Sequence, residues 1–203
     1  MISNHLFSEQ DSTASFPAGL YYQPQFLSAP LQSDLLASID EREWCQELKR
    51  RVQHHGYRYD YKARQVDRTM RLGPLPDFVR DLLNEFLIHE AVGIVFDQLI
   101  VNEYLPGQGI AAHIDCEPCF DDRIAIVSLG WPYEMEFQHA ENRPAASLML
   151  APGSLLVLSG PARYEWTHQI RPRLKDHGIS RRRRVSLTFR KVLLGDCVGA
   201  AGS

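Results

Sequence analysis

The hydrophobic pattern of this chain changes character near residue 95. Beyond that point, short runs of β-branched and aromatic residues are separated by Gly, Pro and Asn, which is typical of strands joined by turns. Eight short strands after a helical start predict a mainly β, α+β fold, either a two-sheet jelly roll (double-stranded β-helix) or a small barrel, with N-terminal helices packed on one sheet. The expected strands are 97–104, 110–114, 123–129, 132–138, 146–150, 154–159, 164–169 and 183–191.

The first half of the chain shows helical spacing instead. Apolar residues recur three or four apart from Leu31 to about His54, which predicts one amphipathic helix with a possible break near Asp40. A second helix is expected over 77–91, where one apolar stripe follows two prolines. Residues 57–71 alternate aromatic and polar side chains, which indicates an exposed hairpin or an ordered loop.

Length and composition predict a single domain. The chain has 203 residues, of which 44% are hydrophobic, so it can bury one core. We expect an irregular lead-in at 1–30, one domain over 31–192 with a lid at about 55–72, and a flexible tail at 193–203. No apolar run approaches the ~18 residues of a spanning helix, and the N-terminus does not resemble a secretory signal. A cytoplasmic monomer with no membrane partner is therefore expected.

The net charge conceals two basic segments. The sum of 22 Lys and Arg against 25 Asp and Glu is −3, which by itself argues against a nucleic-acid partner. However, residues 163–191 hold ten Lys or Arg and two acids, and residues 42–71 hold nine and four. A basic segment is either a phosphate-binding surface or a solvated loop, and the charge alone leaves both possibilities open.

The four cysteines are not expected to form a disulfide framework in a chain without an export signal. Cys116 and Cys119 have the C-x-x-C spacing of half a zinc site or of a redox pair. Cys45 and Cys197 have no nearby cysteine or histidine that would complete such a site. A metal or redox role for this pair is therefore the minor alternative.

The stretch NEYLPGQGIAAHIDCE, residues 102–117, carries the strongest local signal. His113 and Asp115 share one face of a strand because side chains alternate with period two. An imidazole beside a carboxylate supplies two thirds of the facial triad of non-haem Fe(II) oxygenases. His168, 55 residues further on, is the candidate third ligand. Zinc hydrolases and cupin-like proteins use similar ligands, so the triad alone does not identify the metal.

The stretch RVSLTFR, residues 184–190, places Arg184, Ser186 and Arg190 on one strand face and apolar residues on the other. Inward-facing arginines are costly unless they are paired, so they indicate a bound anion or buried acids. The two arginines are about 20 Å apart along an extended strand, so a straight strand could not bring both to one small dianion. A solvated basic face is the alternative.

In this order and spacing, N-E-Y, H-I-D, the distant His and R-V-S-L-T-F-R resemble the AlkB family of Fe(II)/2-oxoglutarate dioxygenases, over roughly residues 95–191. The resemblance implies the cofactor Fe(II), the co-substrate 2-oxoglutarate and O2, with iron held by His113, Asp115 and His168. It also implies that Arg184, with help from Tyr104, binds the distal carboxylate of 2-oxoglutarate. The full set of implied co-substrate residues is Asn102, Tyr104, Arg184, Ser186 and Arg190.

The resemblance also implies substrate contacts. Glu117 stands two positions after the implied iron ligand, where repair members of the family contact the extruded base with an acid. A carboxylate suits the cationic rings of 1-methyladenine and 3-methylcytosine. The base must be single-stranded or flipped out, and the stacking candidates are Tyr57, Tyr59, Tyr61 and Trp166. The candidate phosphate contacts in the basic segments are Arg58, Arg64, Arg181 and Arg182.

These features lead us to expect oxidative demethylation of N-alkylated bases in DNA or RNA, coupled to conversion of 2-oxoglutarate to succinate and release of formaldehyde. GYRYDY at 56–61 and RYEWTH at 163–168 look close to a family branch that hydroxylates a modified wobble uridine in tRNA. That branch also carries an RNA-binding module and a methyltransferase domain, for which this chain has no space, so repair is the favoured expectation. The alternatives are hydroxylation of a protein or small molecule, and a non-enzymatic cupin-like metal-binding sensor.

Overall fold

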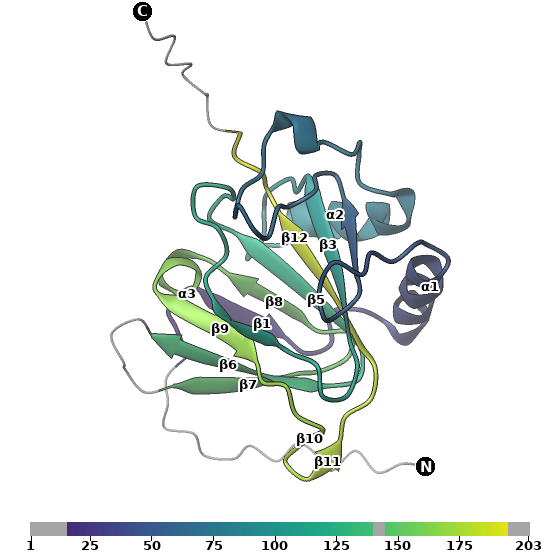
Figure 1. Ribbon diagram of the computed structural model, residues 1–203, viewed down its shortest axis with the longest axis vertical. Coiled ribbons are helices and arrows are strands. Elements are labelled where there is room, and N and C mark those ends of the chain that lie inside the picture. Colours follow the sequence, from purple (N-terminus) through teal and green to yellow (C-terminus); the bar gives the residue numbers. More distant parts are fainter. Residues whose placement is uncertain (1–15, 140–144, 195–203) are drawn as a thin grey trace, which may run out of the picture.

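The computed structural model describes residues 16–139 and 145–194. Two antiparallel sheets form the body of the protein, with the two longest helices on one side (Figure 1). The strands are β1 (Leu20–Gln23), β2 (Val52–His55), β3 (Gln98–Tyr104), β4 (Ile110–His113), β5 (Ile124–Gly130), β6 (Tyr133–His139), β7 (Ala146–Leu150), β8 (Leu155–Leu158), β9 (Trp166–Ile170), β10 (Lys175–Asp176), β11 (Ile179–Ser180) and β12 (Arg184–Arg190). The helices are α1 (Ala29–Asp40), α2 (Arg80–Ile88) and α3 (Gly160–Tyr164), with single 3-10 turns at Arg68–Met70 and Asp77–Val79.

The larger sheet has the order β1-β8-β5-β12-β3-β2, and the smaller has the order β4-β9-β6-β7. Every pairing between these strands is antiparallel, and the short hairpin β10-β11 stands apart from both sheets. Strand β12 lies inside the larger sheet, between β5 and β3. This is a jelly roll, one of the two architectures that the strand pattern predicts.

The larger sheet is covered on both faces, so alternate side chains of its strands enter two different cores. On one face α1 and α2 pack against it, with Phe86 of α2 stacked edge-on against Phe189 of β12 at 5.1 Å between ring centroids. On the other face Ile126 of β5 and Phe137 of β6 belong to the core between the two sheets. The polar face of β12 is also turned toward the smaller sheet, so it lies in the interior of the sandwich.

All eight predicted strands and the second helix are confirmed. The single helix expected from Leu31 to His54 is wrong, because α1 ends at Asp40 and Val52–His55 form strand β2. Pairing of β2 with the edge of β3 satisfies backbone groups that an isolated helix would have bonded internally, and it buries Val52 completely.

Residues 20–23 of the expected irregular lead-in form strand β1, which pairs with β8. Residues 57–71 are an ordered loop with two isolated bridges, Tyr57 to Arg71 and Asp60 to Gln65. Residues 1–15 of the lead-in, residues 195–203 of the expected tail and Cys197 lie outside the described residues. No helix in the described parts of the chain is both long and apolar enough to span a membrane.

Candidate active site

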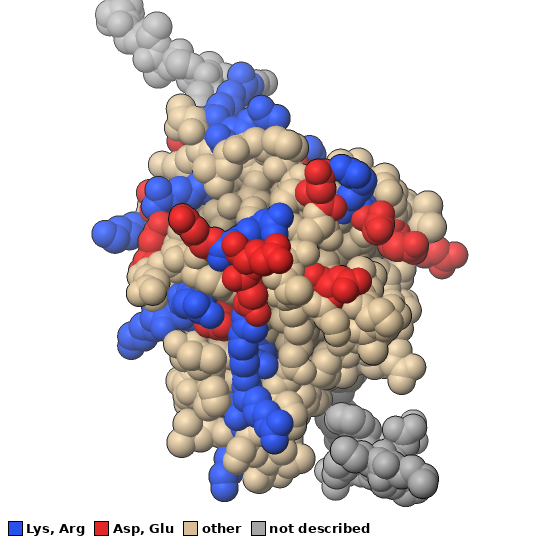
Figure 2. Space-filling model, turned by 90° about the vertical axis from the view of Figure 1, so that its right-hand side faces the viewer, with Lys and Arg blue, Asp and Glu red and all other residues tan. Residues whose placement is uncertain are grey.

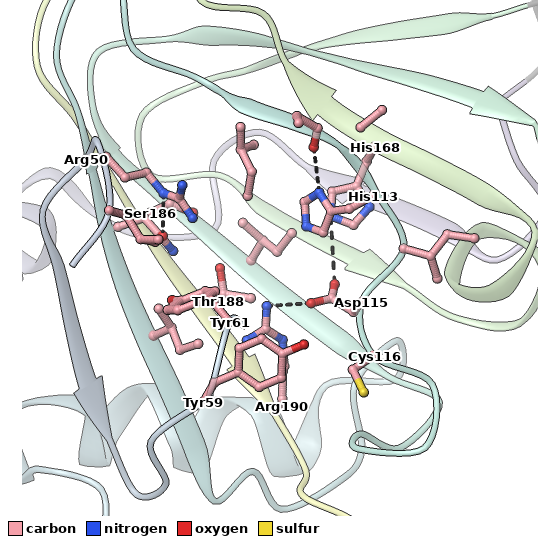
Figure 3. Close-up of a pocket in the computed structure, with 18 of the residues that line it drawn as sticks. Arg50, Tyr59, Tyr61, His113, Asp115, Cys116, His168, Ser186, Thr188 and Arg190 are labelled. Carbon is pink, nitrogen blue, oxygen red and sulfur yellow. Dashed lines mark hydrogen bonds and ion pairs between the residues drawn. The ribbon is translucent and has the colours of Figure 1, made fainter. Parts of the chain in front are cut away.

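Three candidate metal ligands meet where β4 and β9 pair. His113 and His168 are opposite each other in the register of these strands, and their ring centroids are 4.3 Å apart. Asp115 lies two residues after the end of β4, and its Oδ2 lies 3.8 Å from Nε2 of His168 (Figure 3). One ligand atom from each of the three residues lies within 4.8 Å of the others. Two imidazoles and one carboxylate at this spacing fit the donor set of a facial triad.

The protonation states of these side chains suit metal binding. Burial and the neighbouring His113 lower the pKa of His168 to about 3, so its imidazole is neutral at physiological pH. Burial alone would raise the pKa of Asp115, but the nearby Arg190 and the two histidines outweigh it and hold that pKa well below its ordinary value. His113 Nδ1 lies 2.9 Å from the carbonyl oxygen of Ala111, which can only accept, so Nδ1 carries the proton and Nε2 is free for a metal.

Arg190 orients the carboxylate of Asp115. Its NH2 group lies 2.5 Å from Oδ1 of Asp115, which leaves Oδ2 on the side of His168. Arg190 NH1 in turn donates to Oε1 of Gln98, its cross-strand neighbour on β3, at 3.3 Å. The guanidinium is thereby held between the strand and the candidate ligand.

A cavity of about 360 Å³ extends from the three ligands to the other end of β12. At that far end Arg184 is 0% exposed, and its NH2 group donates to Oγ of Ser128 at 2.9 Å. Its Nε and NH1 atoms have no hydrogen-bond partner among the described residues, and burial lowers the pKa of this guanidinium. Unpaired donors on a buried charge are costly, so this end of the cavity fits a carboxylate of a bound molecule.

Further residues expected at the co-substrate line the same cavity. Tyr104 is opposite Arg184 in the register, with the Arg184 guanidinium 5.3 Å from its ring centroid. Asn102 and Ser186 are likewise cross-strand neighbours. The two arginines of β12 thus lie at opposite ends of the cavity: Arg184 lies at the end that fits a carboxylate, and Arg190 lies beside Asp115.

The expected lid residues divide into two groups. Tyr59 and Tyr61 line the cavity and stack edge-on at 5.2 Å, and Tyr59 also contacts Phe120 (Figure 3). Burial raises the pKa of Tyr61 to about 12, and its hydroxyl has no partner among the described residues. Tyr57 and Trp166 do not line the cavity but are buried in the core between the sheets. The expectation that these two stack on a base is therefore not supported by their positions.

Glu117 also lies elsewhere than expected. Its side chain is exposed and does not line the cavity, although Asp115 and Cys116 do. Residue spacing alone places an acid two positions after a ligand, but the loop after β4 turns at this point and directs Glu117 away. The only carboxylate among the described cavity-lining residues is that of Asp115.

One of the four candidate phosphate contacts is wrong. Arg181 has a fully buried side chain that bonds both oxygens of Asp176, at 2.6 and 2.8 Å, so it serves the packing of the loop. Arg58 is exposed and paired with Glu47, Arg182 is exposed over the ring of Trp131, and Arg64 lines the cavity. Acidic and basic side chains alternate over the face in Figure 2, so the basic segments do not form a continuous positive surface there.

Cys116 and Cys119 form a disulfide, whereas the sequence predicts no disulfide framework and leaves a redox pair at these positions as the minor alternative. The turn between them brings their Cα atoms to 5.3 Å, which is within the range that a disulfide can bridge. Cys116 Sγ lies 3.2 Å from the carbonyl oxygen of Arg64, so the bridge contacts the loop 57–71 beside the candidate ligands. Cys45 is free and exposed.

The sequence interpretation missed two arginines at this site. Arg50 lines the cavity and donates from Nε to Oδ1 of Asn102 at 2.9 Å. It gave no signal because the residues around it were expected to be helical. Arg163 lies behind Asp115 and bonds its main chain. The inward face of a strand can be inferred from its period, but the reach of a side chain from a short helix cannot.

Comparison with known proteins gives consistent matches. The family model of the 2OG-Fe(II) oxygenase superfamily matches residues 19–190. A protein of Arabidopsis thaliana named "Alkylated DNA repair protein ALKBH8 homolog" is 39% identical, over 92% of this chain and 62% of its own length. The tRNA (carboxymethyluridine(34)-5-O)-methyltransferase alkbh8 of Xenopus tropicalis is 37% identical, over 90% of this chain and 33% of its own length.

The chain thus spans less than two thirds of the length of either relative. Among solved structures, OsALKBH1 superposes with a TM-score of 0.66 at 20% sequence identity, covering 88% of this chain and 98% of that chain. This likeness concerns the fold, and it agrees with the jelly roll described above.

Proposed function

This chain belongs to the 2OG-Fe(II) oxygenase superfamily, and on that premise we propose that it hydroxylates a modified base in tRNA. It is an AlkB-type dioxygenase that depends on Fe(II), 2-oxoglutarate and O2. When bound together, these three supply a hydroxylating oxidant as 2-oxoglutarate is converted to succinate and CO2. Because the family is one of oxygenases, we set aside the alternative of a non-enzymatic sensor.

In this proposal, the residues of the cavity divide the work between its two ends. His113, Asp115 and His168 hold Fe(II), and Arg190 keeps the carboxylate of Asp115 turned toward the histidines. At the far end Arg184 binds the distal carboxylate of 2-oxoglutarate with the donors that are free in this structure. Asn102, Tyr104 and Ser186 line the space between the two ends. Tyr59 and Tyr61 line the same cavity, where they can stack on a base removed from its neighbours.

The charge of the side chains that line the cavity is the observation that favours a modified tRNA base over a cationic methylated base. Four arginines line it, namely Arg50, Arg64, Arg184 and Arg190. Arg190 is paired with Asp115 and Arg184 is assigned to the co-substrate, so Arg50 and Arg64 remain as the cations that a base would meet. A cationic methylated base entering this cavity would meet repulsion without a free acid to offset it, because Glu117 faces solvent elsewhere. A neutral base, or one bearing an acidic or carbonyl substituent, suits the cavity better. The name of the Xenopus relative specifies carboxymethyluridine in tRNA, which is a base of this kind.

Oxidative demethylation of alkylated bases is the second candidate. It is favoured by the aromatic pair on the lid and by the name of the Arabidopsis relative, which specifies alkylated DNA repair. Both reactions use the same oxidant and differ in the fate of the hydroxylated carbon. Hydroxylation of a stable substituent leaves the oxygen on the base, whereas hydroxylation of an N-methyl group releases formaldehyde.

One experiment separates the two candidates. Purified protein with Fe(II), 2-oxoglutarate and ascorbate is given tRNA anticodon stem-loops with carboxymethyluridine or its methyl ester, and matched DNA and RNA oligonucleotides with 1-methyladenine or 3-methylcytosine. We expect mass spectrometry to show a gain of one oxygen on the uridine substrates, and no gain with the control variant His113→Ala. Formaldehyde release from the methylated bases with unchanged uridines would replace the first candidate by the second. No product from any of these substrates would refute both.

A further inference from the structure

Arg163 is a charged side chain buried next to the candidate metal site. It lies on α3 and is 2% exposed. Its NH1 group donates to the main-chain oxygen of Asp115 at 2.8 Å, and its NH2 group donates to that of Cys116 at 3.2 Å. Its Nε has no hydrogen-bond partner in the described parts of the chain. The planar guanidinium therefore grips two successive carbonyl oxygens of the loop that carries the candidate ligand.

A buried arginine is normally paired with an acid, because removing the charge from water is costly. No ion pair with an acidic side chain forms at Arg163 within the described residues; its hydrogen bonds go to main-chain oxygens. An apolar residue would fill the same space at lower cost if packing were the only requirement. Burial of an arginine without an acidic partner lowers the free energy of unfolding, so its hydrogen bonds to the two carbonyl oxygens indicate a function beyond packing.

The position of Arg163 in the chain suggests that role. His168 follows it by five residues, on the strand β9 that begins just after α3. Asp115 lies on a different segment, the loop after β4. The pairing of β4 with β9 ends at His113, so strand pairing does not fix the main chain of Asp115. The bonds of Arg163 thus tie the loop of one candidate ligand to the element that carries another. Arg190 holds the side chain of Asp115, and Arg163 holds its main chain.

We propose that Arg163 is a positioning residue for the metal site: it fixes the main chain of Asp115 and Cys116 so that the carboxylate stays in register with the two histidines. This inference rests on the proposed use of His113, Asp115 and His168 as metal ligands. Its consequence is that loss of the guanidinium fork weakens metal binding even in a protein that remains folded. Partners of metal ligands commonly contribute about 10- to 100-fold to affinity.

The test is direct metal binding to the full apo-protein, measured by titration with Co(II) and its absorption spectrum. We expect about 10- to 100-fold weaker binding for Arg163→Gln. For Arg163→Lys, which keeps the charge but loses the planar fork, we expect an intermediate loss. Arg42→Lys is the matched control, because Arg42 also donates to a main-chain oxygen, that of Ser38, but far from the ligands. It should bind Co(II) as the native protein does.

A double-mutant cycle separates positioning from general packing. If Arg163 acts through Asp115, the loss caused by Arg163→Lys should largely disappear in an Asp115→Asn background, where binding is already weak. An equal loss in both backgrounds, or native affinity in folded Arg163→Lys and Arg163→Gln, would overturn the inference. Should Arg163→Gln not fold, the Lys variant and its cycle still decide.

A variant at His113 tests the premise separately. If His113→Ala binds Co(II) as tightly as the native protein does, the proposed metal site itself fails. If His113→Ala loses affinity but neither folded Arg163 variant does, the site stands and only the role of Arg163 is rejected.

Discussion

Replacing Arg184 by Met should make the apo-protein more stable and abolish tight binding of 2-oxoglutarate. Arg184 is fully buried, and two of its nitrogen positions have no partner in the described structure. Substituting an apolar side chain for a buried ionic group stabilises proteins by about 1–4 kcal/mol in favourable cases. The hydroxyl of Ser128 loses its donor, at a cost of about 1 kcal/mol. The expected net gain is about 0–3 kcal/mol, or up to about 12 °C in Tm for a chain of this length.

The effect of Arg184→Met on the free energy of 2-oxoglutarate binding is larger than its effect on stability. A carboxylate held by two charge-assisted hydrogen bonds gains about 1.5–3 kcal/mol from each, so the Kd for 2-oxoglutarate should rise at least about 100-fold. In the presence of Mn(II), adding 2-oxoglutarate at about 100 times its Kd should therefore stabilise the native protein by about 2.7 kcal/mol and raise its Tm, relative to Mn(II) alone. The same addition should leave the Tm of Arg184→Met nearly unchanged relative to Mn(II) alone.

Differential scanning fluorimetry with and without 2-oxoglutarate measures both effects, and isothermal titration calorimetry gives the Kd. Arg80→Met is the control, since Arg80 is exposed on α2 and paired with Asp77, and it should change neither quantity by more than about 1 kcal/mol. A lower apo Tm together with native affinity for 2-oxoglutarate would refute the reasoning, because Arg184 would then be a structural cation.

Three further predictions follow from other parts of the structure. Tyr59→Ala and Tyr61→Ala should raise the KM for the oligonucleotide by about 5- to 100-fold, because stacking on a base is worth about 1–3 kcal/mol, and should leave 2-oxoglutarate decarboxylation without nucleic acid unchanged; equal loss of both activities would contradict a role in stacking. Burial lowers the pKa of His54 and of His55 to about 4, below the ordinary value of 6.5, so the unfolded chain takes up protons first and stability should fall as pH drops from about 6.5 toward 4. Urea unfolding across this range should show a smaller fall for His54→Phe, and an unchanged pH dependence would contradict the assignment. Glu103→Gln should cost about 1–3 kcal/mol in urea unfolding, because this buried carboxylate accepts charge-assisted bonds from two arginines; no loss would show that the two arginines find other partners.

Sequence reasoning reached the strands of the jelly roll and the residues that β12 and the β4–β9 pair turn inward. Both depend on a local period: side chains alternate along Arg184–Arg190, and His113 and Asp115 are two residues apart. The sequence reasoning failed where long-range pairing decides the outcome. Val52–His55 fit a helical stripe, but they pair with β3, about fifty residues further along the chain. Likewise, no feature of the sequence near Leu20–Gln23 predicts the pairing of this segment with β8.

The direction of loops was equally beyond local reasoning. Glu117 and Asp115 are two residues apart, yet one is exposed and the other buried, because the strand period ends with β4. Arg181 belongs to a basic run, which predicts an exposed side chain, but its side chain is buried and bonded to Asp176. In both cases the chain geometry of a turn, rather than the residue type, determines what the side chain contacts.

The position of β12 also has a consequence for how the protein is made. It is the last strand of the described chain, yet it lies between β5 and β3 in the larger sheet and contributes to both faces. Until β12 has been synthesised, the gap between β5 and β3 cannot close, and the contacts that close it are distant in sequence, which slows folding. A product that stops short of residue 184 lacks both arginines and the centre of the sheet, so we expect it to be cleared as unfolded chain rather than to persist as a partly active oxygenase.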